Sequence, residues 1–187
     1  MTRIIFVCTA NRIRSPMAEA LFRRAIGDSP VDVTSAGTAA IPGLPAMPEA
    51  VAVAREQDVD LSGHRSRELA QVHPASADLV VCFEWRHMAA AVVEGGADRR
   101  RTIRLIELVD ALQRAAPLPK GDLTERVSNL AALAAPHREP DRSDPAFDLP
   151  DPLGGSEGLY RRTLEEISAL CTRLAALILE GTPGNRT

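Results

Sequence analysis

A segment near the start of the chain, FVCTANRIRSPMAE at residues 6–19, constrains the fold more than any other part of the sequence. An apolar run ends at Cys8 and predicts a short buried strand. A polar loop follows, and then Ser15 and Pro16 predict a helix start, with Ser15 as the N-cap and Pro16 at the first helical position. The segment therefore places a cysteine where a strand ends and an arginine, Arg14, where a helix begins.

Strand and helix patterns alternate along the rest of the chain. Further strands are predicted around 31–35, in DLVVCFE at 78–84 and in RTIRLIEL at 101–108, with helical patterns between and after them. This alternation predicts an α/β fold: a three-layer sandwich with a four-stranded parallel sheet flanked by helices, Rossmann-like, with an anion-binding loop after the first strand. Sites in such sheets lie at the carboxyl ends of the strands, so we expect a pocket at Cys8.

The composition narrows the class of protein. A formal net charge of −3 over 187 residues gives no general attraction to nucleic acid or to membrane surfaces. The N-terminal sequence lacks the apolar stretch of a signal peptide, and no apolar run approaches the length of a membrane span, so we expect a cytoplasmic protein. Three cysteines without a CxxC pair and four histidines without ligand spacing predict no disulfide framework and no metal site. We also expect no cofactor.

The loop between Cys8 and Arg14 has the composition of an anion cradle. Backbone N–H groups pointing into a short loop, together with a helix N-terminus, favour phosphate or a similar oxyanion. Arg14 can add two parallel hydrogen bonds, and the positive field favours the nucleophilic thiolate of Cys8. Asn11 tolerates a left-handed backbone, and Ser15 can donate its hydroxyl to the sulfur. The expected phosphate-binding loop consists of Thr9, Ala10, Asn11, Arg12, Ile13, Arg14 and Ser15.

A simpler interpretation stands beside this one, with Cys8 as a buried core cysteine and Arg14 as a solvated surface charge. A cysteine and an arginine at this spacing are weak evidence by themselves, because buried cysteines are common in strands. The preceding strand, Asn11 and the Ser-Pro helix start favour the anion loop.

Five blocks of sequence resemble the low-molecular-weight protein-tyrosine phosphatase family. The family signature C-x-G-N-x-C-R-S corresponds to CTANRIRS at residues 8–15, which continues into SPMAEA as in bacterial members. The resemblance spans residues 3 to about 180 and implies a cysteine-dependent phosphatase that dephosphorylates phosphotyrosine in proteins through a phosphocysteine intermediate. The other blocks, in the family's order, are TSAGT (34–38), GHRSREL (63–69), ADLVVCFEWRHM (77–88) and DLPDPLGGSEGLYRR (148–162).

The resemblance also implies a role for an aspartate far along the chain. Asp151, before Pro152, matches the family's general acid, which would protonate the leaving oxygen and then activate water to hydrolyse the phosphocysteine. Asp148 and Asp144 compete for this role. Without the family, Asp151 would be interpreted as a turn residue before a proline.

Two further residues are expected, by the same resemblance, to support the loop. His64 matches a family histidine that hydrogen-bonds the loop asparagine, so it would orient Asn11; without the family it would be a surface loop histidine. Ser35 would buttress the loop in the same way. No metal is required, because backbone amides and Arg14 carry the charge.

Several residues depart from the family's pattern. Ala10 stands where glycine is usual and would be strained if φ were positive there. Ile13 replaces a second loop cysteine, so we predict no disulfide within the loop and irreversible oxidation of Cys8 by peroxide. Arg12 stands where tyrosine phosphatases often carry Ile and the arginine-phosphate branch carries Thr; it either favours acidic substrates or points to solvent. Leu153 replaces an aromatic residue after Asp-Pro.

A single low-molecular-weight phosphatase-like domain is expected over residues 1–180, with a flexible tail at 181–187. A helical insertion at about 111–146 exceeds what compact members of the family have there. It is interpreted either as a lid or substrate-docking element or as a helix packed beside the sheet. Arginines occur in or near it at Arg114, Arg126, Arg138 and Arg142.

Three alternatives to a tyrosine phosphatase stay open: a protein-arginine phosphatase, an arsenate reductase of the same fold, and a catalytically impaired phosphate- or phosphopeptide-binding module. Arsenate reduction needs a resolving cysteine, and near the site only Cys82, in an apolar strand, is available; Cys171 is expected in the core. The expected partners are a phosphorylated protein or peptide substrate and inorganic phosphate as product, with no nucleic acid and no membrane. We expect a monomer or weak homodimer.

Overall fold

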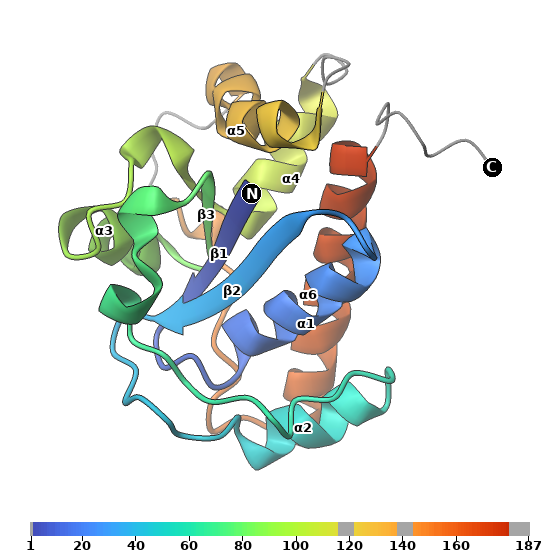
Figure 1. Ribbon diagram of the computed structural model, residues 1–187. Helices are drawn as coiled ribbons and strands as arrows, with labels where there is room; N and C mark the ends of the chain where they lie inside the picture. The colour runs from blue at the N-terminus through green and yellow to red at the C-terminus, as the bar shows by residue number, and fades with distance from the viewer. Residues whose placement is uncertain (1, 116–121, 138–143, 180–187) are drawn as a thin grey trace.

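A parallel four-stranded sheet lies between layers of helices in the computed structural model, which describes residues 2–115, 122–137 and 144–179 (Figure 1). The strand order is β2-β1-β3-β4, so the first strand of the chain lies in the interior of the sheet. The predicted three-layer α/β fold with a four-stranded parallel sheet is confirmed. The strands are β1 (Thr2–Cys8), β2 (Val31–Gly37), β3 (Leu79–Cys82) and β4 (Thr102–Arg104).

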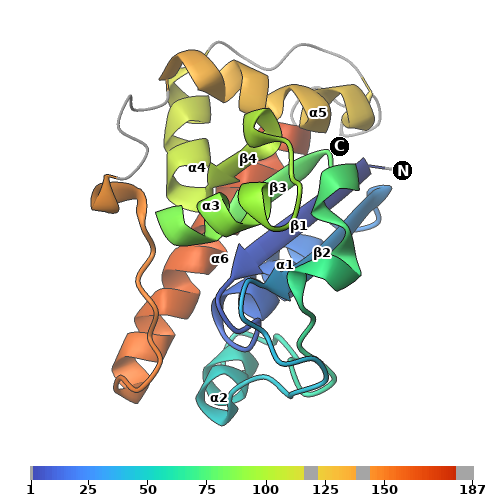
Figure 2. The same ribbon diagram turned by 90° about the vertical axis from the view of Figure 1, so that its left-hand side faces the viewer.

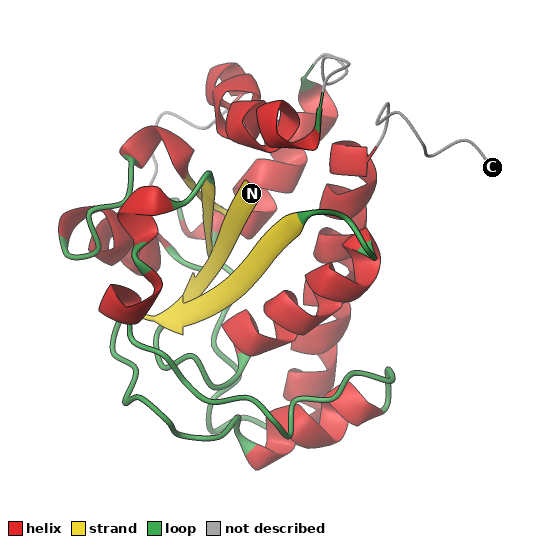
Figure 3. Ribbon diagram, viewed as in Figure 1, coloured by secondary structure: helices red, strands yellow, loops and turns green. Residues whose placement is uncertain are grey.

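Helices cover both faces of the sheet (Figures 2 and 3). The helices α1, α4, α5 and α6 contribute to the larger core on one face, whereas α3 and the short turns η1 and η2 cover the other. Within the described residues, no helix is both long and apolar enough to cross a membrane. The α-helices are α1 (Arg14–Ile26), α2 (Pro48–Arg55), α3 (Trp85–Val93), α4 (Leu105–Arg114), α5 (Leu123–Ala134) and α6 (Glu157–Leu179); the 3-10 turns are η1 (Leu69–Val72), η2 (Pro74–Ser76), η3 (Arg99–Arg101), η4 (Ala135–His137) and η5 (Pro145–Phe147).

The two faces of β1 explain why its sequence is a continuous apolar run. Ile4 and Phe6 point into the larger core, whereas Ile5 and Val7 point into the smaller one beside α3. Successive side chains of a strand alternate between faces, so a strand covered on both sides needs apolar residues at every position. Cys8, the last residue of β1, falls on the side of the larger core.

The topology places a binding site where β1 ends. The chain goes from β1 to β2 on one side and returns to β3 on the other side of β1. Such a reversal of strand order is where ligands bind in open parallel sheets, beyond the carboxyl ends of the strands. Cys8, Gly37 and Cys82 are the last residues of the three neighbouring strands at this edge.

The start of α1 differs from the prediction. The helix begins at Arg14, and Ile13 at the N-cap position makes no side-chain capping bond. Ser15, the predicted N-cap, lies inside the first turn, and its hydroxyl contacts Cys8 and Asn11 instead. The first N–H groups of a helix have no partner within it, so those of α1 stay available to an anion in the loop.

The region interpreted as an insertion contains α5, which packs against β1, β3, α4 and α6. Arg126 in α5 is 2% exposed and donates from Nε to the carbonyl of Ile178 (2.8 Å), so it is a structural cation rather than a docking group. Arg114 pairs with Asp110 within α4 (2.5 Å). Arg138, Arg142 and the predicted tail at 181–187 lie outside the described residues.

Candidate active site

Cys8 lies where β1 passes into the loop that leads to α1. Its side chain is only 3% exposed, yet it lines a cavity rather than being enclosed on all sides by core. The sulfur accepts the N–H of Asn11 (3.3 Å) and lies 2.9 Å from the hydroxyl of Ser15. The sulfur thus has an amide N–H and a hydroxyl within hydrogen-bond distance. The structure therefore places the Cys8 thiol at a cavity that Arg14 and Asp151 also line.

Asn11 shapes the loop through its backbone and its side chain. It has φ of 54°, and it is the one residue of the loop 8–15 with positive φ. Its amide donates to the hydroxyls of Ser15 (2.9 Å) and Ser35 (2.8 Å), and its side-chain carbonyl accepts the N–H of Arg67 (2.8 Å). Because the Ser15 oxygen accepts from Asn11, the Ser15 proton can point toward Cys8. Asn11 is thus the centre of the network beneath the loop.

His64 and Ser35, the two residues that the family resemblance connects with the loop, both contact Asn11. His64 donates from Nε2 to the main-chain carbonyl of Asn11 (2.7 Å), rather than to the side chain. Burial lowers the pKa of His64 more than this hydrogen bond raises it, which favours a neutral ring. Ser35 accepts from Asn11 and donates its hydroxyl hydrogen bond to the carboxylate of Glu19 (2.6 Å), so the support of the loop extends into α1.

Gly37, at the end of β2, supports the loop in a way that the sequence did not indicate. A Cβ at this position would lie 2.4 Å from the carbonyl oxygen of Thr9 and 2.8 Å from the nitrogen of Asn11. Only a residue without a side chain allows the loop to approach the strand so closely. Ala10, by contrast, is unstrained, because the left-handed position is Asn11 and not Ala10.

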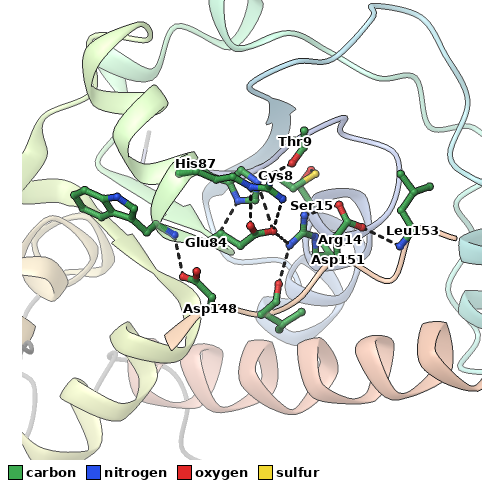
Figure 4. A network of polar contacts seen from close by, with 12 residues as sticks. Cys8, Thr9, Arg14, Ser15, Glu84, His87, Asp148, Asp151 and Leu153 are labelled. Carbon is green, nitrogen blue, oxygen red and sulfur yellow. Dashed lines mark hydrogen bonds and ion pairs between the residues drawn. The ribbon is translucent and has the colours of Figure 1, made fainter. Parts of the chain in front are cut away.

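Arg14 is buried, at 1% exposure, and is bound by two distant segments of the chain, one at Glu84 and one at 149–151. Its Nη1 donates to the carboxylate of Glu84 and to the carbonyl of Leu149 (2.7 Å), and its Nη2 donates to Asp151 (2.7 Å). Figure 4 shows the guanidinium between Glu84 and Asp151. The Nε atom is buried and has no partner among the described residues. A buried cation with one unused donor beside a thiol is suited to bind an oxyanion.

Asp151 is the aspartate that reaches the site. One carboxylate oxygen accepts from Arg14 and the other accepts the N–H of Leu153 (3.1 Å). Asp148 instead accepts the N–H of Trp85 (2.9 Å) and pairs with the buried Arg104 (3.0 Å). Asp144, the other competitor, caps η5 through the N–H of Ala146 (2.9 Å). The geometry therefore separates Asp151 from both competitors.

The cavity between these groups is small, about 70 Å³. Arg12 stands at its edge, half-buried, with Nε donating to the carbonyl of Pro45 (2.7 Å), so it neither fills the cavity nor points freely to solvent. Ile13 lines the cavity and packs into the larger core, where the family signature has cysteine. The lining residues are Cys8, Ala10, Arg12, Ile13, Arg14, Met47, Asp151 and Leu153.

Glu84 and His87 also belong to the site, although sequence analysis assigned them no role. Burial raises the pKa of Glu84, but the hydrogen bond and charge of Arg14, together with the hydrogen bond of Arg86, outweigh it and leave the pKa lowered. His87 is buried beside Thr9, and burial together with the Arg14 charge lowers its pKa to about 3. Its Nδ1 accepts the N–H of Glu84 (3.1 Å), so the proton is on Nε2, which donates to Thr9 Oγ1 (2.9 Å). The sequence feature that could have indicated both residues is their position directly after the predicted strand β3, where ligands bind in parallel sheets.

An oxyanion-binding loop between a central strand and the following helix, with a thiol at its base and a carboxyl group opposite, defines the class of cysteine-based phosphatases. Residues 3–120 match the model of the family described as low molecular weight phosphotyrosine protein phosphatase. The chain belongs to this family.

Similar proteins of known name cover the whole length of the chain. A protein-arginine-phosphatase of Bacillus subtilis (strain 168) is 32% identical over 175 residues, covering 92% of this chain and 93% of that protein. A low molecular weight protein-tyrosine-phosphatase of Streptomyces coelicolor is 31% identical over 187 residues, which cover 97% of this chain and 96% of that protein. Among solved structures, the YwlE arginine phosphatase from Geobacillus stearothermophilus superposes with a TM-score of 0.73 at 27% identity, over 100% of this chain and 99% of that one.

Proposed function

We propose that the chain hydrolyses phosphomonoesters of phosphotyrosine in proteins through a phosphocysteine intermediate on Cys8. The observation that carries this proposal is the cavity at the end of β1, which Cys8, Arg14 and Asp151 share. The thiol has two hydrogen-bonding groups around it, the cation has an unused Nε, and the carboxyl group lines the same cavity. The three groups supply a nucleophile, a charge partner and a proton donor.

In the first step the Cys8 thiolate attacks phosphorus, a sulfur–phosphorus bond forms and the bond to the ester oxygen breaks. Arg14 and the loop amides bind the other oxygens of the phosphoryl group. Asp151, in its protonated form, gives its proton to the departing oxygen. Arg14 now holds Asp151 through Nη2, and a bound phosphoryl group would compete for that guanidinium and release the carboxyl group toward the leaving oxygen.

In the second step a water molecule attacks the phosphocysteine. Asp151 takes its proton, the sulfur–phosphorus bond breaks, and inorganic phosphate and the Cys8 thiolate are released. Ser15 stabilises the thiolate as a leaving group through its hydroxyl at 2.9 Å. A similar structure supports a covalent intermediate at this position: a YwlE cysteine-to-serine mutant, 30% identical with a TM-score of 0.71, is described as carrying a phosphorylated active site serine.

Arg12 favours tyrosine over arginine as the phosphorylated residue. Its guanidinium is fixed at the cavity edge by Pro45, so a substrate guanidinium would meet a like charge there, whereas a phenol would not. Phosphoarginine is the second candidate, because a protein-arginine-phosphatase of Bacillus subtilis is similar over nearly the full chain.

Arsenate reduction and phosphate binding without turnover have less support. Arsenate reduction needs a second reactive thiol, but Cys82 is fully buried at the end of β3 and burial raises its pKa, while Cys171 is buried in α6. A binding module without turnover would need neither a thiol nor a carboxyl group at the anion site, and this cavity has both.

The test is hydrolysis of p-nitrophenyl phosphate by the wild type and by Cys8→Ser and Asp151→Asn variants, with and without EDTA. We expect Cys8→Ser to lose activity by about a thousandfold or more and Asp151→Asn by about a hundredfold or more, with no effect of EDTA. Phosphotyrosine and phosphoarginine peptides then separate the two substrate candidates. Unchanged turnover in Cys8→Ser would overturn the proposal.

We further propose that the protein acts in the cytoplasm and is a monomer or weak homodimer. Each chain folds into one domain over residues 1–180. Phosphorylated proteins are its substrates. Sedimentation at micromolar concentration tests the oligomeric state, and limited proteolysis tests the domain limits.

A further inference from the structure

A groove of about 290 Å³ lies along the outer face of α3, separate from the catalytic cavity. The indole of Trp85 is 38% exposed and Val93 is 82% exposed, and both are among the exposed large apolar side chains of the described chain. Apolar side chains gathered in a hollow, rather than scattered singly, are typical of an interaction site. The groove is lined by Trp85, Met88, Ala89, Val92, Val93 and Arg99.

Positive charge lies at the end of this groove where Arg99 lines it and Arg100 follows in the chain. Residues 85–101 contain four arginines against one glutamate and one aspartate, although the whole chain has a net charge of −3. Arg99 and Arg100 are exposed and form no ion pair with any residue that the structure describes. Arg86, at 62% exposure, pairs with Glu84 (2.6 Å). The complementary surface would therefore combine an apolar side chain with acidic neighbours.

The groove begins next to the catalytic site. Trp85 directly follows Glu84, whose carboxylate pairs with Arg14. The nine residues of α3 extend the groove about 13 Å from that point. An extended polypeptide of roughly four residues covers this length. One substrate polypeptide can therefore place a phosphorylated residue at Cys8 and a neighbouring segment in the groove.

We propose that the α3 groove docks an acidic segment with one or two large apolar side chains, located beside the phosphorylated residue of the protein substrate. Its place in catalysis rests on the proposed phosphatase function, but the binding itself does not. The apolar side chain enters the hollow between Trp85 and Val93, and carboxylates face Arg99 and Arg100. A hollow of this volume fits side chains of a polypeptide better than the flat surface of a lipid bilayer.

Trp85 is the one tryptophan of the chain, so its fluorescence reports directly on the groove. The probe is an unphosphorylated peptide that contains Glu-Leu-Phe-Glu; the comparison peptide contains Lys-Leu-Phe-Lys. We expect the acidic peptide to give a saturable blue shift, since burial of the indole removes water from it. Val93→Glu should weaken this binding about tenfold or more, and Arg99→Glu with Arg100→Glu should weaken it similarly. Ile41→Glu, at an exposed apolar residue outside the groove, is the matched control and should bind as the wild type does.

Kinetics then connect docking with catalysis. For a phosphotyrosine peptide with the acidic-apolar segment, the groove variants should raise KM about tenfold and leave kcat unchanged. Their kcat/KM for p-nitrophenyl phosphate should stay within about twofold of the wild type, because that substrate is too small to reach α3.

Three results would overturn the proposal: no shift of Trp85 emission with the acidic peptide up to millimolar concentration, an equal shift with the basic peptide, or a shift only with anionic phosphatidylglycerol vesicles. A wild-type protein that binds the acidic peptide but fails to hydrolyse p-nitrophenyl phosphate would instead contradict the phosphatase function and leave the docking site standing.

Discussion

Single residues set the shape of the anion loop, and they do so at positions that the signature alone does not reveal. The loop tolerates Ala10 because the residue with positive φ is Asn11, an asparagine that accepts this conformation. The tight approach falls instead at Gly37 in β2, whose missing side chain leaves room for Thr9 and Asn11. The loop can therefore have alanine at position 10, where the family signature has glycine, because the close approach requires a glycine at position 37 of β2 instead.

A Gly37→Ala substitution tests this assignment. Because its Cβ would meet the carbonyl oxygen of Thr9 at 2.4 Å, the loop must move away from the strand, and kcat/KM for p-nitrophenyl phosphate should fall about a hundredfold. Gly63→Ala is the control, since its Cβ would meet no atom within 4 Å and activity should be retained. Equal activity of the two variants would contradict the role of Gly37.

His87 makes stability depend on pH in a defined direction. The folded protein holds its pKa at about 3, below the ordinary value of 6.5, so the unfolded chain binds more protons between these two pH values. Stability is therefore retained above pH 6.5 and lost as the pH falls toward 3, with His87 contributing about 1.4 kcal/mol per pH unit within that window. His64 also makes the protein less stable as the pH falls, because its pKa in the folded protein is lowered too.

Urea unfolding at pH 7 and pH 5 measures this dependence. In His87→Gln the side-chain amide can still donate to Thr9. The loss of unfolding free energy between the two pH values should therefore be smaller than in the wild type, by about 1.4 kcal/mol for each pH unit between 6.5 and 5. An identical loss in wild type and variant would mean that His87 does not bear the depressed pKa.

The individual elements differ in how well the sequence predicts them. β1 and β3 were predictable, because apolar runs bounded by polar residues leave little room for any structure except a buried strand. The start of α1 was not, since Ser15 and Pro16 have the pattern of a cap but the hydroxyl is used by Cys8. The packing of α5 was also hidden, because Arg126 resembles a surface residue until its partners at the end of α6 are known.

Arg126 joins α5 to the end of α6. It donates to the carbonyls of Ile178 (2.8 Å) and Leu177 (3.0 Å), which lie in the last turn that the structure describes for α6. Arg126→Ala should lower the free energy of unfolding by about 2–4 kcal/mol, because it removes these bonds of a buried cation.

Activity per folded molecule should stay unchanged in Arg126→Ala, since α5 contributes no side chain to the catalytic cavity. Arg114→Ala, at a half-exposed arginine that pairs within α4, is the comparison and should cost less than about 1 kcal/mol. Urea unfolding of both variants gives the two values; equal losses would show that the contact with α6 adds nothing.

At the scale of the whole molecule, the site gathers three segments that are far apart in the sequence. The first, residues 8–15, is contiguous, so its chemistry could be predicted from the sequence alone. Glu84 and Asp151 meet Arg14 only through the sheet order and the path of the chain from η5 to α6 (Figure 4). Physical reasoning on the sequence could not bring Asp151 to Cys8; only the family resemblance indicated it. Glu84 and His87 were missed because their contacts depend on the parallel pairing of β3 with β1.

The interior position of β1 has a consequence for how the two halves of the site open. Strand β1 is hydrogen-bonded on both edges and buried on both faces, so its amides should exchange with deuterium only through global unfolding. Asp151 instead lies on an irregular segment, half-buried and held mainly by Arg14 and Leu153. A local opening of this segment would leave Cys8 and its loop in place, so we expect amides near Asp151 to exchange with deuterium faster than those of β1.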